Sequence, residues 1–273
     1  MFGHHSSAPA PSSAPHTTLA TVVSSAAPTS TAASPVNTPS PSTGGKRGVA
    51  FNIASLTDLF TGSTFSWAYN WGADASGSIL SKLEYVPMLW GNRADFTSAW
   101  DSQVSKALAG GSTHILGFNE PDHTEQANMS PADAVNAWKQ YIQPYSSKAK
   151  LISPAVTNGA APMGLAWLSS FLSGCGDCTI DAVAVHWYDA ATNVEYFKQH
   201  ITDAHTQTGK PVWITEFGAS GSDDQVSSFL SQVLPWLDSQ DFVERYSYFM
   251  AAEGTLVSGG ALSTYGKTYL DAA

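Results

Sequence analysis

Charged residues are scarce in this chain of 273 residues: they make up 12% of it, and 22 acidic side chains outnumber 12 basic ones. With a formal net charge of −10, the chain lacks the basic excess with which proteins bind nucleic acid or anionic membrane surfaces. No apolar run approaches the roughly 20 residues that a membrane-spanning helix needs. Two cysteines are too few for a disulfide-based scaffold.

Apolar and aromatic residues, by contrast, are plentiful. Hydrophobic residues make up 43% of the chain and aromatic residues 11%. This is enough to build a core, so the chain is not disordered throughout. The length suits one large domain or one domain with an appendage.

An abrupt change in composition near residue 45 marks the appendage. Of the 38 residues from 6 to 43, 32 are Ser, Thr, Pro or Ala, and none is charged. Such a segment cannot bury enough apolar area to offset its ordering entropy, so we expect a disordered tail over residues 1–45 and a folded domain over 46–273. The composition is typical of O-glycosylated stalks on secreted proteins, although an unmodified spacer would share it. We therefore expect a secreted or cell-wall protein, with no secretory signal at the start of this sequence.

Eight short runs rich in β-branched and aromatic residues follow the tail. They are GVAFN (48–52), SWAYNW (66–71), YVPMLW (85–90), HILGFNEP (114–121), KLISPAV (150–156), AVAVHWY (182–188), PVWITEF (211–217) and RYSYFM (245–250). Helical patterns lie between them at 96–108, from the N-cap Ser130 onward, and at 194–204 before Gly209. The first gap, around Asp58, offers only one helical turn.

Strands and helices that alternate eight times predict an α/β fold, the closed parallel (β/α)8 TIM barrel. An open doubly wound sheet is the alternative, but no Gly-rich phosphate loop follows the first run. In a barrel of this kind the chemistry gathers at the C-terminal ends of the strands. The side chains expected there are Asn52, Tyr69, Asn70, Trp71, Trp90, Asn119, Glu120, His186, Trp187, Tyr188, Glu216 and Glu253.

Two of these carboxylates, Glu120 after the fourth strand and Glu216 at the end of the seventh, lie among aromatic rings and amides. Cleavage of a glycosidic bond needs one carboxylic acid to protonate the leaving oxygen and a second carboxylate to attack the anomeric carbon or activate water. We expect Glu120 to be the acid and Glu216 the nucleophile. Strand alternation makes each glutamate the end of an apolar row that faces the barrel interior, and it turns Trp213 toward the covering helices. A structural ion pair or a solvated rim carboxylate is the alternative for either glutamate alone.

Three motifs in this order carry a family resemblance: GFNEPD (117–122), AVAVHWY (182–188) and WITEFG (213–218). Asn-Glu-Pro after the fourth strand and a Glu ending the seventh resemble the clan A (β/α)8 glycoside hydrolases. Together the motifs resemble glycoside hydrolase family 128, the fungal and bacterial β-1,3-glucanases, from about residue 48 to residue 270. The resemblance implies a retaining mechanism with Glu120 as acid/base and Glu216 as nucleophile. It also implies a β-1,3-glucan substrate such as laminarin or a fungal wall glucan.

The polar neighbours of the two glutamates have chemically plausible roles. The Asn119 amide is expected to bond the sugar 2-hydroxyl in the transition state, or else to close a strand-to-loop turn. His186 and Tyr188 share a facing and are expected to hold Glu216 ionised, unless His186 is a satisfied core histidine. Burial and the nearby carboxylate are expected to raise the pKa of Glu120, so that it keeps its proton. Retention requires carboxyl groups about 5–5.5 Å apart, against roughly 6.5–9.5 Å for inversion.

Aromatic rings at the strand ends are expected to bind sugar by stacking. We assign Trp71, Trp90 and Tyr69 to substrate binding together with Asn52, with burial in the core as the alternative for each ring. Trp187 alternates away from this side, so a binding role for it is no more favoured than a core role.

Cys175 and Cys178 stand in a CGDC sequence, which in a cytosolic protein would indicate redox chemistry or half a metal site. No second cysteine pair and no histidine cluster completes four ligands, so we expect a short-loop disulfide and no metal. Asn128 begins the one N-glycosylation pattern of the chain, and the nearby Pro131 is expected to lower its use.

We therefore expect a secreted, monomeric, retaining endo-β-1,3-glucanase that needs no cofactor. Two alternatives stay open. One is a wall-binding protein that keeps the barrel and its aromatic rings but does not cleave. The other is a clan A enzyme for β-1,4-linked glucan or mannan, which nothing next to the two glutamates excludes. Endo action depends on whether loops block one end of the cleft.

Overall fold

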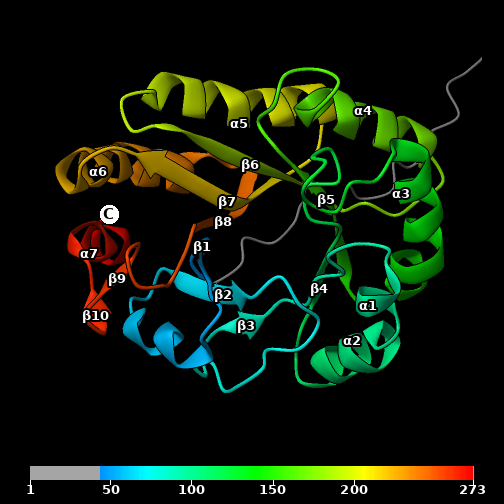
Figure 1. The fold of residues 1–273 in the computed structure, drawn as a ribbon, viewed down its shortest axis with the longest axis horizontal. Coiled ribbons are helices and arrows are strands. Elements are labelled where there is room, and N and C mark those ends of the chain that lie inside the picture. Colours follow the sequence, from blue (N-terminus) through cyan, green and yellow to red (C-terminus); the bar gives the residue numbers. More distant parts are fainter. Residues whose placement is uncertain (1–43, 273) are drawn as a thin grey trace, which may run out of the picture. The chain divides into compact units, whose positions relative to one another are not determined.

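Eight parallel strands form one sheet that curls into a barrel, and helices cover its outside (Figure 1). The computed structural model describes residues 44–272, so the predicted tail lies almost entirely outside the described residues. The strands are β1 (Arg47–Ala50), β2 (Phe65–Tyr69), β3 (Glu84–Tyr85), β4 (His114–Leu116), β5 (Lys150–Val156), β6 (Ala182–Ala190), β7 (Val212–Ser220) and β8 (Val243–Tyr248). Their order is β3-β2-β1-β8-β7-β6-β5-β4, so β1 pairs with β8 and every other pair is consecutive in the chain. The predicted (β/α)8 fold is confirmed, and each of the eight predicted runs overlaps one strand.

The ring closes between β3 and β4 through the segment that follows β3. Met88 pairs in parallel with Leu116. The Leu116 amide donates to the Pro87 carbonyl at 2.9 Å, and the Asn119 amide donates to the Trp90 carbonyl at 2.9 Å. Because Pro87 has no N–H to donate, the regular ladder of β3 stops before it.

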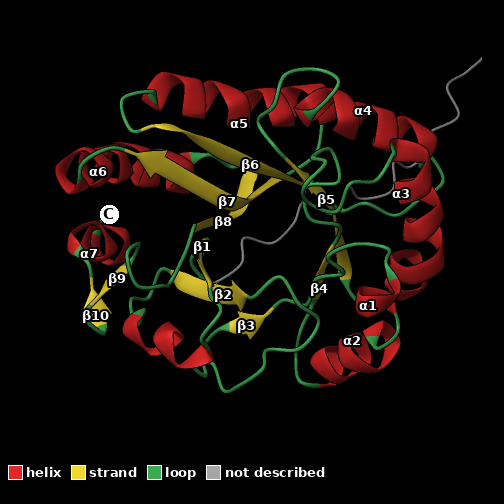
Figure 2. Ribbon diagram, in the orientation of Figure 1, coloured by secondary structure: helices red, strands yellow, loops and turns green. Residues whose placement is uncertain are grey.

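The helices lie outside the sheet, as Figure 2 shows. They are η1 (Ala54–Leu59, 3-10), α1 (Ala94–Thr97), α2 (Trp100–Ala109), α3 (Pro131–Ala137), η2 (Trp138–Ile142, π), η3 (Gln143–Tyr145, 3-10), α4 (Gly164–Gly174), α5 (Val194–Thr208), α6 (Asp223–Ser239) and α7 (Thr264–Asp271); β9 (Val257–Ser258) and β10 (Ala261–Leu262) form a small hairpin. As predicted, the Ser130 side chain caps α3, and Gly209, with φ 65°, ends α5. The helix predicted over 96–108 is two helices, because Ala99 leaves the helical conformation (φ −105°, ψ 0°).

Apolar side chains form two separate cores. The outer core lies between sheet and helices and includes Phe118 and Ile214, whereas the interior core is built from side chains of the strands and of the segment after β3, among them Leu116 and Trp213. The Trp213 ring lies 5.1 Å from the ring of Trp67 inside the barrel. The prediction that Trp213 packs under the helices is therefore wrong, and the expected rows of alternating residues leading to the two glutamates are wrong as well.

A bulge in β7 is the reason for the positions of Trp213 and Glu216. The register between β6 and β7 shifts by one residue at Thr215, so that Ile214 lies before the irregularity and Glu216 pairs with His186 after it. An extra residue of this kind lets two successive side chains face the same side of a sheet. Trp213 faces inward and Ile214 outward, and then both Thr215 and Glu216 face inward. Glu216 thus reaches the interior by a route that strict alternation does not predict.

An ion cluster closes the N-terminal end of the barrel. Glu84 lies 2.6 Å from Arg245 Nη2 and 3.0 Å from His114 Nδ1, and the guanidinium lies over the Trp213 ring at 4.7 Å. Burial alone would raise the pKa of Glu84, but the His114 hydrogen bond and the charge of Arg245 lower it to about 2. This end of the barrel serves stability, as is usual in the fold.

Removal of the tail is expected to leave the barrel unchanged. The fully buried Arg47 donates to the carbonyl oxygens of Tyr269 at 2.7 Å and Ala272 at 2.8 Å, so that β1 and α7 hold each other without any residue before Gly44. A chain that begins at Gly44 should keep its Tm to within about 2 °C, which is less than about 1 kcal/mol for a domain of this size. Calorimetry of both chains measures this, and a loss of several degrees would show that the tail stabilises the domain.

Candidate active site

A cleft of about 780 Å³ opens at the C-terminal ends of the strands. Seven residues predicted from the sequence line it: Asn52, Trp71, Trp90, Asn119, Glu120, Tyr188 and Glu216. Eight further lining residues were not predicted: His123, Gln126, Thr157, Asn158, Gly159, Met163, Phe249 and Met250. His186 lies beneath the cleft floor, fully buried.

Glu120 reaches the cleft from an irregular segment after β4. Its backbone has φ 44°, in the left-handed region that costs a non-glycine residue of order 1–3 kcal/mol. Its amide donates to the Ala155 carbonyl at 2.8 Å, which fixes the segment beside β5. Trp71, with φ 59°, also has a left-handed backbone. Two of the residues that line the cleft thus have strained backbones held in place by the surrounding barrel.

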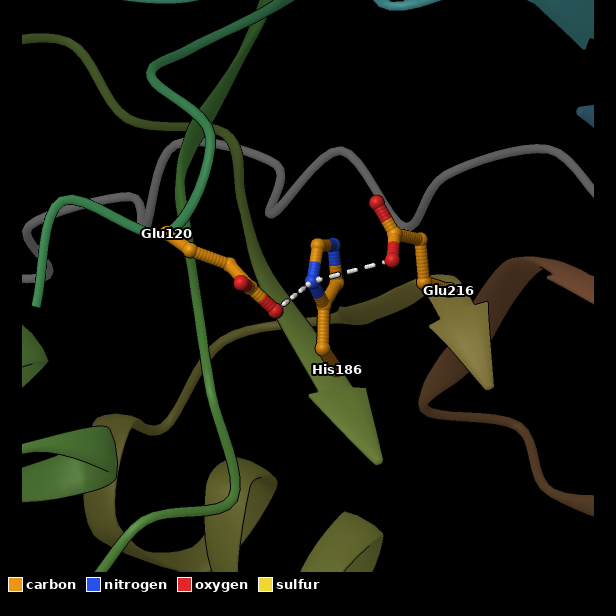
Figure 3. A group of neighbouring side chains, drawn as sticks. All are labelled: Glu120, His186 and Glu216. Atoms are coloured by element: carbon orange, nitrogen blue, oxygen red, sulfur yellow. Dashed lines mark hydrogen bonds and ion pairs between the residues drawn. The ribbon is translucent and has the colours of Figure 1, made fainter. Parts of the chain in front are cut away.

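His186 lies between the two glutamates, as Figure 3 shows. Its Nδ1 is 2.8 Å from Glu120 Oε1 and 3.7 Å from Glu216 Oε2. On the opposite edge of the ring, Nε2 is 2.9 Å from the hydroxyl of Thr215, the bulge residue. The histidine was expected to hydrogen-bond Glu216, but its hydrogen bond is to Glu120. The bulge therefore supplies two neighbouring groups at once: a hydroxyl that positions the imidazole and the carboxylate of Glu216.

The carboxylate of Glu216 accepts two hydrogen bonds from aromatic side chains. The indole Nε1 of Trp71 donates to Oε1 at 2.6 Å, and the hydroxyl of Tyr188 donates to Oε2 at 2.5 Å. Donors to both oxygens fix the orientation of the carboxylate. Tyr188 thus makes the predicted hydrogen bond to Glu216, whereas Trp71 contacts the carboxylate directly and is not only a stacking surface.

The titration of the pair formed by Glu120 and His186 differs from the expectation. Burial alone would raise the pKa of Glu120, but the hydrogen bond and positive charge of His186 outweigh it, so the pKa is lowered. Burial alone would lower the pKa of His186, but the charge of Glu216 and its hydrogen bond with Glu120 raise it. The prediction of a raised pKa for Glu120 is therefore wrong, because it did not include a histidine at 2.8 Å. The two shifts have a common origin in the hydrogen bond, which favours the state with one proton between Glu120 Oε1 and His186 Nδ1.

The same three residues could in principle hold a metal ion, since one ligand atom of each lies within 4.8 Å of the others. Histidine and carboxylate ligands suit several divalent metals. Here, however, Nδ1 and Glu120 Oε1 already face each other at hydrogen-bond distance, and both Glu216 oxygens accept bonds from Trp71 and Tyr188. This geometry fits a shared proton better than a cation.

Tyr69 does not line the cleft. Its side chain is fully buried in the interior core, and its hydroxyl donates to the Thr215 carbonyl at 2.8 Å. The prediction that Tyr69 stacks on sugar is wrong, because the Trp71 ring lies 5.0 Å away on the cleft side and covers it. Tyr69 instead supports the bulge from within the barrel.

Asn119 and Asn52 both line the cleft but differ in exposure. Asn119 is 4% exposed, its Nδ2 is 3.5 Å from Gln126 Oε1, and its Oδ1 has no hydrogen-bond partner among the described residues. A buried acceptor without a partner is costly, so Oδ1 is available to a substrate hydroxyl. Asn52 is exposed, with Nδ2 3.8 Å from Met250 Sδ.

Aromatic rings line two sides of the cleft. Trp90 is half-buried, and its ring packs on Phe96 at 4.9 Å. Phe249, which no sequence pattern singled out, lies 5.6 Å from Trp71 and 5.8 Å from Tyr188. Trp187 is fully buried in the outer core, on the side opposite the cleft.

The last residue of the GFNEPD motif shapes the cleft wall. The carboxylate of Asp122 accepts hydrogen bonds from Thr157 Oγ1 at 2.6 Å and from the Gly164 amide at 2.8 Å. Gly164 has φ 58°, and a Cβ there would lie 2.3 Å from the Gly159 carbonyl oxygen, so only glycine fits. These contacts fix the loop between β5 and α4, in which sequence patterns alone mark no functional residue.

Cys175 and Cys178 are joined by a disulfide after α4. No helix within residues 44–272 is both long and apolar enough to cross a membrane.

A family model described as the glycosyl hydrolase catalytic core matches residues 48–269. The chain belongs to this family. Its resemblance to glycoside hydrolase family 128 is confirmed by solved structures. One is a family 128 (subgroup III) curdlan-specific exo-β-1,3-glucanase from Blastomyces gilchristii, 45% identical with a TM-score of 0.78, covering 83% of this chain and 97% of that one. Another is a subgroup I endo-β-1,3-glucanase from Amycolatopsis mediterranei in complex with laminaritriose, 29% identical with a TM-score of 0.73, covering 84% and 100%.

Among curated proteins, this glycosyl hydrolase is similar to alkali-sensitive linkage protein 1 of Schizosaccharomyces pombe. The two are 34% identical over 254 residues, which cover 84% of this chain. The match spans 45% of the yeast protein, so the chain corresponds to less than half of that relative.

Proposed function

We propose that this glycosyl hydrolase is a retaining β-1,3-glucanase in which Glu120 is the acid/base and Glu216 the nucleophile. The observation that carries the proposal is the separation of the two carboxyl groups, an oxygen of each lying within 4.8 Å of the other. Retaining enzymes hold their carboxyl groups about 5–5.5 Å apart, whereas inverting enzymes leave roughly 6.5–9.5 Å for a water molecule. The short separation favours direct attack by Glu216.

The first step forms a glycosyl-enzyme ester. A Glu216 oxygen attacks the anomeric carbon while the bond from that carbon to the leaving oxygen breaks, and a proton from Glu120 passes to the leaving oxygen. Glu120 and His186 share that proton. When it moves from His186 Nδ1 to Glu120 Oε1, the imidazolium becomes a neutral imidazole and the carboxylate becomes a carboxylic acid. In the second step Glu120 takes a proton from water, whose oxygen attacks the anomeric carbon and releases Glu216.

The neighbouring side chains favour this course of reaction. Trp71 and Tyr188 hold the Glu216 carboxylate in a fixed orientation before attack. The free acceptor of Asn119 suits a sugar hydroxyl, whose hydrogen bond can strengthen in the transition state.

The β-1,3 linkage is supported by the two solved relatives, whose names give this substrate. The Blastomyces enzyme is named as exo-acting and the Amycolatopsis enzyme as endo-acting. Exo action is therefore the alternative to the endo action that we expect from the sequence. Exo action is favoured by the higher identity to the Blastomyces enzyme, 45% against 29%. Sizing the earliest products from laminarin separates the two: an endo enzyme releases a ladder of oligosaccharides, an exo enzyme a single short product.

Release of reducing sugar from laminarin tests the activity itself. We expect release from laminarin and none from linear β-1,4-glucan or β-mannan, with the Glu120→Gln/Glu216→Gln double variant as an inactive control. Binding of laminarin without release would support the wall-binding alternative. Cleavage of the β-1,4-linked chains instead would contradict the proposed linkage.

The tryptophans are expected to separate into two classes when replaced. Trp90→Ala should weaken oligosaccharide affinity by about 1–3 kcal/mol with little change in kcat, since its ring is a stacking surface. Trp71→Phe keeps a ring but loses the bond to Glu216, so kcat should fall more than affinity. Titration calorimetry and kinetics measure both. Equal effects of the two variants on affinity and on kcat would contradict this division.

We further propose that the protein works outside the cytoplasm as a monomer. The Cys175–Cys178 disulfide supports the first point, because such bonds persist in oxidising compartments. Glycosylation of the tail and of Asn128 remains a prediction that mass spectrometry of the native protein would test.

A further inference from the structure

An exposed tyrosine stands just outside the catalytic cleft. Tyr196, in the first turn of α5, has 40% of its surface exposed. Its ring lies 5.9 Å from that of Trp187 beneath it, and its hydroxyl is bonded to Asn158 through Nδ2 at 3.1 Å and the carbonyl oxygen at 3.3 Å. The ring is thus exposed yet fixed in position, so a ligand that stacks on it would lose little side-chain entropy.

Asn158 joins this tyrosine to the cleft. Its side chain accepts from the Tyr188 amide at 3.1 Å and donates to the Tyr188 carbonyl at 3.2 Å, and it lines the cleft itself. Tyr188 donates to Glu216. One asparagine therefore bonds both the exposed ring and a residue of the catalytic centre, and the two surfaces are continuous through it.

Beyond Tyr196 lies a second hollow, of about 510 Å³, between the N-terminal end of α5 and the side of α6 that bears Gln225, Ser228 and Gln232. The two helices lie side by side (Figure 1). Polar side chains line most of the hollow: those of Thr192, Asn193, Glu195, Tyr196, Gln225, Ser228 and Gln232. Amides, hydroxyls and one carboxylate beside an aromatic ring, with no Lys or Arg, suit an uncharged polyhydroxylated ligand.

Both glutamates are connected to the side of the cleft that leads to the hollow. Glu120, which protonates the leaving group, is hydrogen-bonded to β5 at Ala155, and Asn158 follows three residues later. The nucleophile accepts hydrogen bonds from Trp71, after β2, and from Tyr188, in β6, to which Asn158 is bonded. Asn158 is thus linked to the acid through β5 and to the nucleophile through Tyr188, so the groove beyond it is continuous with the part of the cleft in which both glutamates act.

We infer that the groove formed by Tyr196 and the hollow between α5 and α6 binds a part of a β-glucan chain that extends beyond the catalytic cleft. The inference rests on the proposed function, since it assumes a glucan in the cleft. Binding in this groove makes kcat/KM depend on the length of the glucan, because only a chain long enough to pass Asn158 gains the additional contact.

Kinetics on chains of different length test the groove. Tyr196→Ala should lower kcat/KM on laminarin about 10-fold, the loss expected from one stacking contact, and leave kcat/KM on a short aryl β-laminaribioside within about twofold of wild type. Tyr196→Phe keeps the ring and should retain most activity on both. Ser228→Trp fills the hollow from the exposed face of α6 and should reproduce the loss on laminarin alone. Tyr141→Ala, a tyrosine in η2 that lines neither hollow, is the matched control.

Two outcomes of these kinetics would contradict the binding of glucan in the groove. One is an equal loss on both substrates for Tyr196→Ala, which indicates a structural role; the other is no loss on laminarin for either Tyr196→Ala or Ser228→Trp. If the wild type cleaves no glucan, the proposed function is contradicted without any test of the groove. Calorimetry with laminarihexaose and laminaritriose then tests whether the groove binds glucan. Tighter binding of the longer chain that Tyr196→Ala removes supports it, and equal or absent binding of both overturns it.

Discussion

Glu216→Gln is expected to lower kcat on laminarin by about 10⁴–10⁶-fold, the order of loss seen when a catalytic nucleophile is removed. The amide cannot form the glycosyl-enzyme ester. It should still fit the site, since its carbonyl can accept from Trp71 and its NH₂ can donate to the Tyr188 hydroxyl, the two groups that now bond the carboxylate. The fold and the glucan affinity should therefore persist, and kinetics, calorimetric Tm and oligosaccharide titration measure all three.

Tyr188→Phe is the matched control for this variant. It keeps Glu216 and the ring but removes one of the two donors to the carboxylate, so turnover should fall far less than in Glu216→Gln. Appreciable turnover by Glu216→Gln with an intact fold would show that Glu216 is not the nucleophile.

Glu120→Gln is expected to have an effect that depends on the leaving group. Turnover of laminarin should fall by about 10²–10⁴-fold, the usual contribution of general acid–base catalysis. Aryl glycosides with good leaving groups need no proton in the first step, so the aryl alcohol should appear in a rapid burst followed by slow hydrolysis of the ester. Stopped-flow absorbance resolves the burst. An equal loss on laminarin and on activated aryl glycosides, without a burst, would contradict the acid/base role.

The hydrogen bond between Glu120 and His186 also makes stability depend on pH. The lowered pKa of Glu120 gives stability that is present above its ordinary value of 4.5 and lost as pH falls through the folded value. The raised pKa of His186 gives stability that is fully present below its ordinary value of 6.5 and lost as pH rises through the folded value. The Tm difference between wild type and Glu120→Gln should therefore be largest between pH 4.5 and 6.5 and shrink on both sides. Turnover should fall on the alkaline side as the shared proton is lost.

The barrel could be predicted because its signals are local. Strand runs, the Ser130 cap and Gly209 each follow from a few neighbouring residues, and the ends of parallel strands meet at one edge of the barrel. The same reasoning predicted both glutamates at this edge, where both line the cleft, but it did not predict how either side chain reaches it.

The orientation of the side chains could not be predicted, because it depends on irregularities that leave no pattern. Residues on both sides of β7 are apolar, so nothing in the run indicates that an extra residue at Thr215 interrupts the alternation. Trp213 was therefore assigned to the wrong side, and Thr215 was missed as the partner of His186. Burial of Tyr69 beneath Trp71 follows likewise from packing across the barrel, which no single strand contains.

The stereochemistry of the first product tests the two-glutamate mechanism most directly. Proton NMR of a laminari-oligosaccharide digest, recorded within the first minutes and before mutarotation, identifies the anomer that the enzyme releases. Attack by Glu216 followed by attack of water inverts the anomeric carbon twice, so the new reducing end should have the β configuration. An α-configured first product would mean a single inversion through water, and it would contradict the role of Glu216 as nucleophile.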